Sequence, residues 1–198
     1  MKELELKYYA HSQIGVETIC DLWVAMYDGY NLVDRANTLK HEFYYDTEDH
    51  ALRRKGIYAR LDVNRSLIMV KIGDSESGLF NREEITVSTM DDFYHYVDSL
   101  GVNSDLIVPL LQVMTYRKSL TLDLEGAIVE MCKDTFYYCK VGERMGEAHY
   151  ELEFELKSGD EKALDIIREM MLEYVGDDLS PSEISKAERG FQLMTKEG

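Results

Sequence analysis

Glutamates recur at every second position in two segments that lie far apart in the chain. The first, ELELK, runs from Glu3 to Lys7, and the second, ELEFELK, runs from Glu151 to Lys157. Because residues i, i+2 and i+4 share one face of a β-strand, each segment predicts a strand with a row of carboxylates that ends in a lysine. Carboxylate oxygens suit Mg²⁺ or Mn²⁺, and lysine binds phosphate oxygens.

An acidic row also fits an ordinary solvent-exposed strand face. Carboxylates on one face lie only about 7 Å apart and repel, however, so exposed faces tend to mix Thr and Lys among them. Other predicted strands carry single cations among apolar or small residues, at Arg60, Lys71, Arg82 and Arg117. If these strands shared one closed sheet, its interior would hold carboxylates on one side and cations on the other. Such an interior suits a polyanion together with a divalent cation.

The elements that would position these residues are mostly strands. Period-two patterns and turn residues predict strands at 3–10, 41–47, 56–64, 66–73, 82–88, 115–123, 127–134, 135–142 and 149–158. Helical spacing predicts helices at 14–27, 91–100, 161–176 and 182–194, with further helical turns around 105–111. Many meandering strands with few inserted helices favour an antiparallel α+β or barrel fold over βαβ units.

Composition narrows the class of protein. The 198 residues fit one domain, spanning residues 1–198, and the formal net charge is −16. That charge argues against nucleic acid or an anionic membrane as the main partner, since both need a basic face. It does not exclude a small anionic substrate, because salt screens charges over about 8 Å. Three cysteines without metal-ligand spacing, no membrane-length apolar run and no signal peptide lead us to expect a cytoplasmic protein.

The order of motifs along the chain resembles the CYTH superfamily, the triphosphate tunnel metalloenzymes. ELELK matches the family's ExExK signature, YYDTEDHALRRKGIYARL resembles its Tyr-Asp-Thr turn and following arginine strand, and IMVKIG supplies the lysine strand. NREEITV resembles the R-x-E strand, VEMCKD the acidic strand, and SPSEISKAERGFQL the final S-K-x-E-R-G helix. The resemblance implies an eight-stranded antiparallel β-barrel, a tunnel with helices packed outside and at its ends.

The resemblance also implies roles for individual residues. It implies that a linear triphosphate lies in the tunnel, bound by Lys7, Arg60, Lys71, Arg82, Arg117 and Lys186. It implies that Mg²⁺ or Mn²⁺ is held by carboxylates from the set Glu3, Glu5, Glu84, Glu153 and Glu155. Glu151 and Glu153, with Lys7, would orient the attacking water or act in catalysis. Asp62, Glu130 and Asp134 are further candidates, although Lys133 competes with its neighbours for the inward position.

Three departures from the family pattern bear on substrate choice. The second arginine of an LRxR strand is replaced by Asp62, which would face the tunnel and remove one phosphate contact. The basic residue often found two positions before Arg117 is Thr115, although Lys118 is adjacent, and the second glutamate of an R-x-E-x-E strand is Thr86. Losing one charge-assisted contact costs about 1.5–3 kcal/mol of binding.

Three functions therefore stay open at this point. The first is metal-dependent hydrolysis of inorganic tripolyphosphate or an organic triphosphate such as thiamine triphosphate. The second is an adenylate cyclase, although no nucleobase pocket can be identified from these residues. The third is a non-catalytic polyphosphate- or nucleotide-binding module, suggested by Asp62. The protein would act as a monomer or a homodimer.

Overall fold

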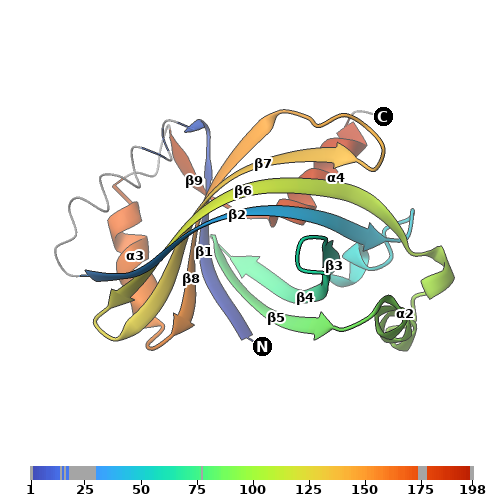
Figure 1. Cartoon of the computed structure of the whole chain (residues 1–198), viewed down its shortest axis with the longest axis horizontal. Helices are drawn as coiled ribbons and strands as arrows, with labels where there is room; N and C mark the ends of the chain where they lie inside the picture. The colour runs from blue at the N-terminus through green and yellow to red at the C-terminus, as the bar shows by residue number, and fades with distance from the viewer. Residues whose placement is uncertain are drawn as a thin grey trace.

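The fold is a closed antiparallel β-barrel, seen in a computed structural model that describes residues 2–13, 15, 17, 30–76, 78–173 and 178–196 (Figure 1). Its strands are β1 (Lys2–Ala10), β2 (Tyr30–Asp46), β3 (Ile57–Asp62), β4 (Leu67–Glu76), β5 (Leu79–Val87), β6 (Val108–Leu124), β7 (Ala127–Lys140) and β8 (Ala148–Ser158). They follow the order β5-β4-β3-β2-β6-β7-β8-β1, and β1 pairs with β5 to close the sheet. The expected eight-stranded barrel is confirmed. A short ninth strand, β9 (Leu179–Pro181), pairs with β1.

Several predicted element boundaries are wrong. The two strands expected at 127–134 and 135–142 form the single strand β7, and β2 begins 11 residues before the expected residue 41. Only a 3-10 turn, η2 (Ser104–Leu106), occurs where helical turns were expected around 105–111, because β6 begins at Val108 and pairs with β2. Most of the helix expected at 14–27 lies outside the described residues.

Helix α3 (Lys162–Met171) covers the outside of the barrel beside β1 and β8 (Figure 1). Leu4, Leu6 and Tyr8 point outward from β1 and form one core cluster with Leu164 and Ile167 of the helix. Burial of these apolar side chains fixes the face of β1, since a one-residue slip would turn every side chain over. Glu3, Glu5 and Lys7 therefore face the interior.

Helix α2 (Met90–Ser99) covers the outer face of β3, β4 and β5 in the same way. Thr89 caps it by accepting a hydrogen bond from the Asp92 backbone N–H at 3.1 Å. Phe93 and Val97 of the helix pack on outward residues such as Val70 of β4. The alternate residues of β3 and β4, including Arg60 and Lys71, consequently face inward.

Helix α4 (Lys186–Lys196) packs on inward-facing residues of the barrel rather than on its outer wall. Its Phe191 joins Tyr44, Leu111 and Phe136 in one core cluster. Gly190 permits this close approach, because a Cβ there would lie 2.7 Å from both Leu111 and Tyr138 side-chain atoms. The helix thus closes one end of the barrel and directs its first residue, Lys186, into the interior.

No helix in the described part of the chain is both long and apolar enough to cross a membrane.

Candidate functional site

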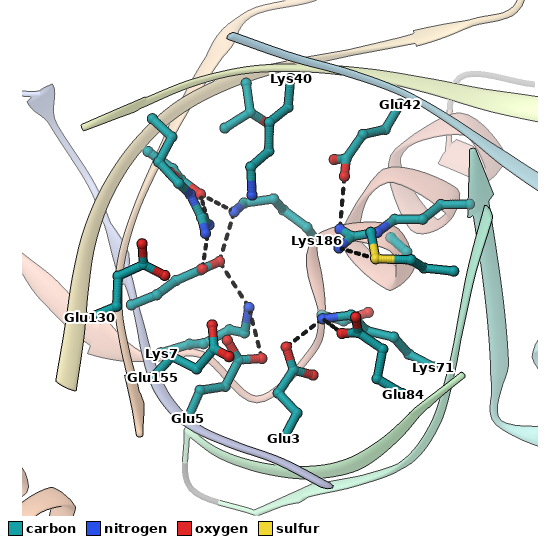
Figure 2. A pocket seen from close by; sticks show the side chains of 18 of the residues that line it. Glu3, Glu5, Lys7, Lys40, Glu42, Lys71, Glu84, Glu130, Glu155 and Lys186 are labelled. Atoms are coloured by element: carbon teal, nitrogen blue, oxygen red, sulfur yellow. Dashed lines mark hydrogen bonds and ion pairs between the residues drawn. The ribbon is translucent and has the colours of Figure 1, made fainter. Parts of the chain in front are cut away.

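The barrel encloses a cavity of about 410 Å³ whose lining is dominated by charged side chains (Figure 2). Its acidic lining residues are Glu3, Glu5, Glu42, Glu84, Glu130, Asp134, Glu153 and Glu155. Its basic lining residues are Lys7, Lys40, Arg60, Arg65, Lys71, Arg82, Arg117, Lys157 and Lys186. The structure therefore brings all six predicted phosphate-binding cations and all five predicted metal-binding carboxylates to one cavity.

Glu3, Glu5 and Glu155 form a three-carboxylate cluster across the β1–β8 pair. One oxygen from each lies within 4.8 Å of the others, the spacing of a divalent-cation site. Burial, together with the charges of Glu5 and Glu3, raises the pKa of Glu155. Mutual repulsion among buried carboxylates is relieved by a bound cation, so the donor set fits a hard, oxygen-binding metal such as Mg²⁺ or Mn²⁺.

Two cations beside this cluster keep Glu3 ionised. Burial alone would raise the pKa of Glu3, but Lys71 and Arg82 lower that pKa to about 2. Lys71 forms ion pairs with Glu3 and, at 3.2 Å, with Glu84, while Arg82 bridges Glu3 and Glu5. Glu84 is thus a partner of a cation at the edge of the cluster.

Glu153 lies instead among cations from three different elements. Lys7 and Lys186 each donate to its Oε1 at 2.8 Å, and Arg117 binds its other oxygen. Against the effect of burial, Arg117, Lys186 and Lys7 hold the pKa of Glu153 well below its usual range. Among the described residues, Glu153 is not part of the three-carboxylate cluster, so a direct metal contact has less support than for Glu155.

Glu151 is completely buried next to Glu153 and is not part of the cavity lining. Its carboxylate lies 3.1 Å from the Lys186 ammonium group and 3.9 Å from that of Lys7. Burial, with the neighbouring charge of Glu153, raises the pKa of Glu151 to about 7. Its geometry suits it to hold the two lysines in place.

The remaining acidic candidates differ in position. Asp134 is buried and binds Arg117 Nε at 2.8 Å, and Lys133 points to the outside, where it pairs with Glu17 at 3.4 Å. Glu130 lines the cavity and pairs with Lys157 at 2.9 Å.

Asp62 is buried but is not a lining residue. Its carboxylate accepts a hydrogen bond at 3.2 Å from the backbone N–H of Arg65 in the β3–β4 turn. Asp62 shares the inward strand face of Arg60, but the β3–β4 turn binds its carboxylate, which keeps it out of the cavity lining. The Arg65 side chain, from that same turn, lines the cavity instead.

The Tyr-Asp-Thr turn supports the helix that carries Lys186. Asp46 accepts backbone N–H bonds from Thr47 and Leu52 at 2.8 Å and from Arg53 at 3.1 Å, which fixes the 3-10 turn η1 (Arg53–Lys55). Arg53 then lies 3.7 Å from the carboxylate of Glu188 on α4 and over the Phe191 ring. Tyr58 donates to the same carboxylate at 2.9 Å.

The sequence reasoning missed two charged lining residues on β2, Lys40 and Glu42. Glu42 is buried and its carboxylate lies 2.8 Å from the Arg60 guanidinium. The signal was present, since Lys40, Glu42 and Tyr44 alternate with other residues in LKHEFYY. A strand predicted to begin at residue 41 leaves out Lys40, and Glu42 alone does not show the alternation of charged residues.

The CYTH domain family matches residues 1–191. A search of curated protein sequences found no match for this chain.

Solved structures with the same fold come from several different organisms. A putative adenylyl cyclase from Hippeastrum, described as having a dominant triphosphatase activity, superposes with a TM-score of 0.63 at 18% identity, covering 98% of this chain and 95% of that one. A putative adenylate cyclase from Bacillus halodurans gives 0.58 at 16% identity, covering 96% and 98%. The PH1819 protein of Pyrococcus horikoshii gives 0.51 at 13% identity, covering 98% and 99%. At these identities the likeness shows the fold alone, whereas the family match spans nearly the whole chain: this protein belongs to the CYTH domain family.

Proposed function

We propose that this protein is a metal-dependent triphosphatase that hydrolyses a linear triphosphate inside the barrel. The observation that carries the proposal is the arrangement of charges in one cavity inside the barrel: the three-carboxylate cluster on β1 and β8 faces cations from the surrounding strands and α4. A metal–triphosphate complex has the complementary distribution of charge, with a cation for the carboxylates to bind and an anionic chain for the lysines and arginines to bind. The dominant triphosphatase activity described for the Hippeastrum protein, which has the same fold, supports this choice of reaction.

Lys7, Arg60, Lys71, Arg82, Arg117 and Lys186 would bind the phosphate oxygens. In the structure these cations are bound to carboxylates, for example Arg60 to Glu42 and Lys7 to Glu153, both at 2.8 Å. A triphosphate would share or replace those carboxylates. The network therefore holds the cations in place before the substrate arrives, which lowers the cost of organising them.

Glu3, Glu5 and Glu155 would hold Mg²⁺ or Mn²⁺ against the phosphate chain. A bound divalent cation would neutralise phosphate charge and withdraw electrons from the phosphorus centre. Lys71 binds Glu3 and Arg82 binds Glu5, and these ion pairs would orient the two carboxylates.

The reaction would need no covalent nucleophile from the protein. Water attacks the terminal phosphorus, the bridging P–O bond breaks, and orthophosphate and pyrophosphate leave. Glu153 is ionised and faces the cavity, so it can accept a hydrogen bond from that water. Glu151 would position Lys7 and Lys186. Burial raises the pKa of Cys132 far above its usual range, which keeps this thiol protonated and unsuited to attack.

Phosphate release provides the test. Tripolyphosphate, thiamine triphosphate and ATP would be incubated with Mg²⁺ or Mn²⁺, and cyclic AMP would be measured in the same ATP reactions. We expect phosphate from at least one triphosphate, no cyclic AMP, and loss of turnover in Arg117→Gln, which removes a cation bound to both Asp134 and Glu153.

The two other functions are outcomes of the same assay. Cyclic AMP formation would show that the protein is a cyclase rather than a triphosphatase. If nothing turns over but tripolyphosphate raises the melting temperature, the protein is a binding module.

A further inference from the structure

Lys40 is a cavity-lining lysine without an acidic partner. Among the described residues, no carboxylate oxygen lies within 4.0 Å of its ammonium group and no hydrogen bond to that group is found. The nearest acidic residue in sequence on its own strand face, Glu42, is bound to Arg60 at 2.8 Å. Arg65 also lines the cavity without an ion pair to any described residue, but it is exposed in a turn, whereas Lys40 is half-buried on β2.

The charges around Lys40 are predominantly repulsive. Burial and the neighbouring charges of Arg117 and Arg60 lower its pKa to about 8, despite the opposing effect of Glu42 and Asp134. A half-buried cation among other cations is unfavourable unless an anion compensates it. The positive charge on this wall of the cavity is therefore not compensated by the acidic residues of the lining.

The position of Lys40 suits it to contact a ligand in the cavity. It points into the cavity from the wall opposite Glu3 and Glu5 (Figure 2). A phosphate chain whose metal lies at Glu3, Glu5 and Glu155 would have its remaining oxygens directed towards that wall.

The register of the barrel connects Lys40 with a departure in the sequence. Lys40 on β2 is the direct partner of Thr115 on β6, and Thr38 is the partner of Arg117. Thr115 occupies the position, two residues before Arg117, at which the resemblance led us to expect a basic residue. Directly paired residues of an antiparallel ladder have Cβ atoms about 4.5–5.5 Å apart, so a long side chain from either strand reaches the same region.

We propose that Lys40 is a substrate-binding residue that contacts the phosphate chain opposite the three-carboxylate cluster and supplies the positive charge that Thr115 lacks. The ligand class rests on the proposed function, but the contact itself is tested by binding, without turnover. This contact would favour ligands long enough to reach both the cluster and the β2 wall.

Calorimetric titration with inorganic tripolyphosphate in EDTA at pH 7 provides the test. Lys40→Gln should weaken binding by about tenfold or more, the effect of losing one charge-assisted contact. Lys40→Arg should retain most of the affinity. The matched control is Lys118→Gln, which removes the same charge from the exposed, outward side of β6 and should leave the dissociation constant within about twofold.

Moving the lysine from β2 to its paired position on β6 tests the position of the charge separately from folding. The single variant Lys40→Thr should lose affinity, and the double variant Lys40→Thr/Thr115→Lys should recover it to within about threefold, because the ammonium group returns from the paired strand. Pyrophosphate, which is shorter, should respond less to Lys40→Gln than tripolyphosphate does.

The outcomes separate this inference from the proposed function. Wild-type affinity in Lys40→Gln, or an equal loss in Lys118→Gln, overturns the role of Lys40 even if the enzyme hydrolyses triphosphates. A loss confined to Lys40 variants supports it even if no triphosphate turns over. Failure of the wild-type protein to bind tripolyphosphate in EDTA overturns the role of Lys40, and failure to bind it with Mg²⁺ or Mn²⁺ as well overturns both.

Discussion

Single residues in this cavity carry charges whose cost is offset by neighbours at hydrogen-bond distance. Glu5 belongs to the three-carboxylate cluster and is also bound to Arg82, and Lys7 lies 3.1 Å from it. The same carboxylate thus serves the proposed metal site and the cation network. Removing its charge should separate these two functions.

Glu5→Gln should reduce metal-dependent phosphate release by at least about 100-fold, because an amide replaces one charged ligand of the metal. Metal-free tripolyphosphate binding should weaken little or even strengthen, since a negative charge leaves the cavity. The measurements are initial rates over a Mg²⁺ titration and calorimetry in EDTA. Glu147→Gln, at an exposed glutamate, is the control. Unchanged activity in Glu5→Gln would remove Glu5 from the metal site.

Lys40 should make the protein less stable at neutral pH than it would be without this charge. Its pKa falls from the ordinary 10.5 to about 8 on folding, so the folded state holds fewer protons than the unfolded state between these values. Stability should therefore rise with pH through that window, and below about pH 8 the charged lysine should cost about 1–3 kcal/mol.

Lys40→Met should accordingly raise the urea midpoint at pH 7 and remove that part of the pH dependence. The groups that act on this amine are Arg117, Arg60, Glu42 and Asp134. None of the four ordinarily titrates between pH 8 and 10. A lower midpoint in Lys40→Met would show that the lysine stabilises the empty barrel.

At the scale of elements, α4 determines whether Lys186 reaches the cavity. The Tyr138 hydroxyl donates to the Lys186 carbonyl oxygen at 2.8 Å, and η1 holds Glu188 through Arg53. Gly190 sets the distance between the helix and the barrel wall. The S-K-x-E-R-G motif therefore packs α4 against the barrel and also provides Lys186.

Gly190→Ala should destabilise the protein by about 1–3 kcal/mol, although alanine normally favours a helix by about 1 kcal/mol over glycine. The new Cβ would lie 2.7 Å from Leu111 and Tyr138 atoms, so α4 must move outward and withdraw Lys186. Urea unfolding and tripolyphosphate affinity should both fall. Thr195→Ala, at an exposed position of the same helix, should change neither. Increased stability in Gly190→Ala would mean that α4 packs less closely.

Strand alternation explains which parts of this site the sequence could predict. The glutamate rows in ELELK and ELEFELK face inward because the leucines and Phe154 between them are buried on the outer face of the barrel. This alternation is a local pattern that the sequence shows directly. Which carboxylate meets which cation depends on ladder register, such as the closing β1–β5 pair between Glu3 and Arg82. Register over such separations is not encoded in a local pattern. The capture of Asp62 by the Arg65 backbone depends likewise on the exact turn.

At the scale of the whole molecule, the barrel combines a strongly acidic chain with a cavity of nearly balanced charge. The formal net charge is −16, yet the cavity lining contains both signs in similar number. The internal ion pairs therefore matter for stability as well as for binding. Burial alone would raise the pKa of Asp134 and Glu42, but the charges of neighbouring guanidinium and ammonium groups lower both pKa values overall.

Acid should consequently unfold the empty barrel by protonating these carboxylates. A carboxyl group whose pKa is lower in the folded state stabilises the protein at pH values above its unfolded-state pKa, which is about 4 for Asp and Glu. This stabilisation is lost as the pH falls below that pKa. The urea midpoint in EDTA should drop steeply between pH 5 and pH 3.

Asp134→Asn should lower the midpoint at pH 7, because Arg117 and Lys186 lose a buried partner, and should flatten the acid slope. The control Glu147→Gln should follow the wild-type curve, since this glutamate is exposed. Parallel curves for Asp134→Asn and wild type would show that the ion pairs inside the barrel do not govern its acid stability. A flattened curve would show that the charges proposed to bind a polyanion also stabilise the barrel without a ligand.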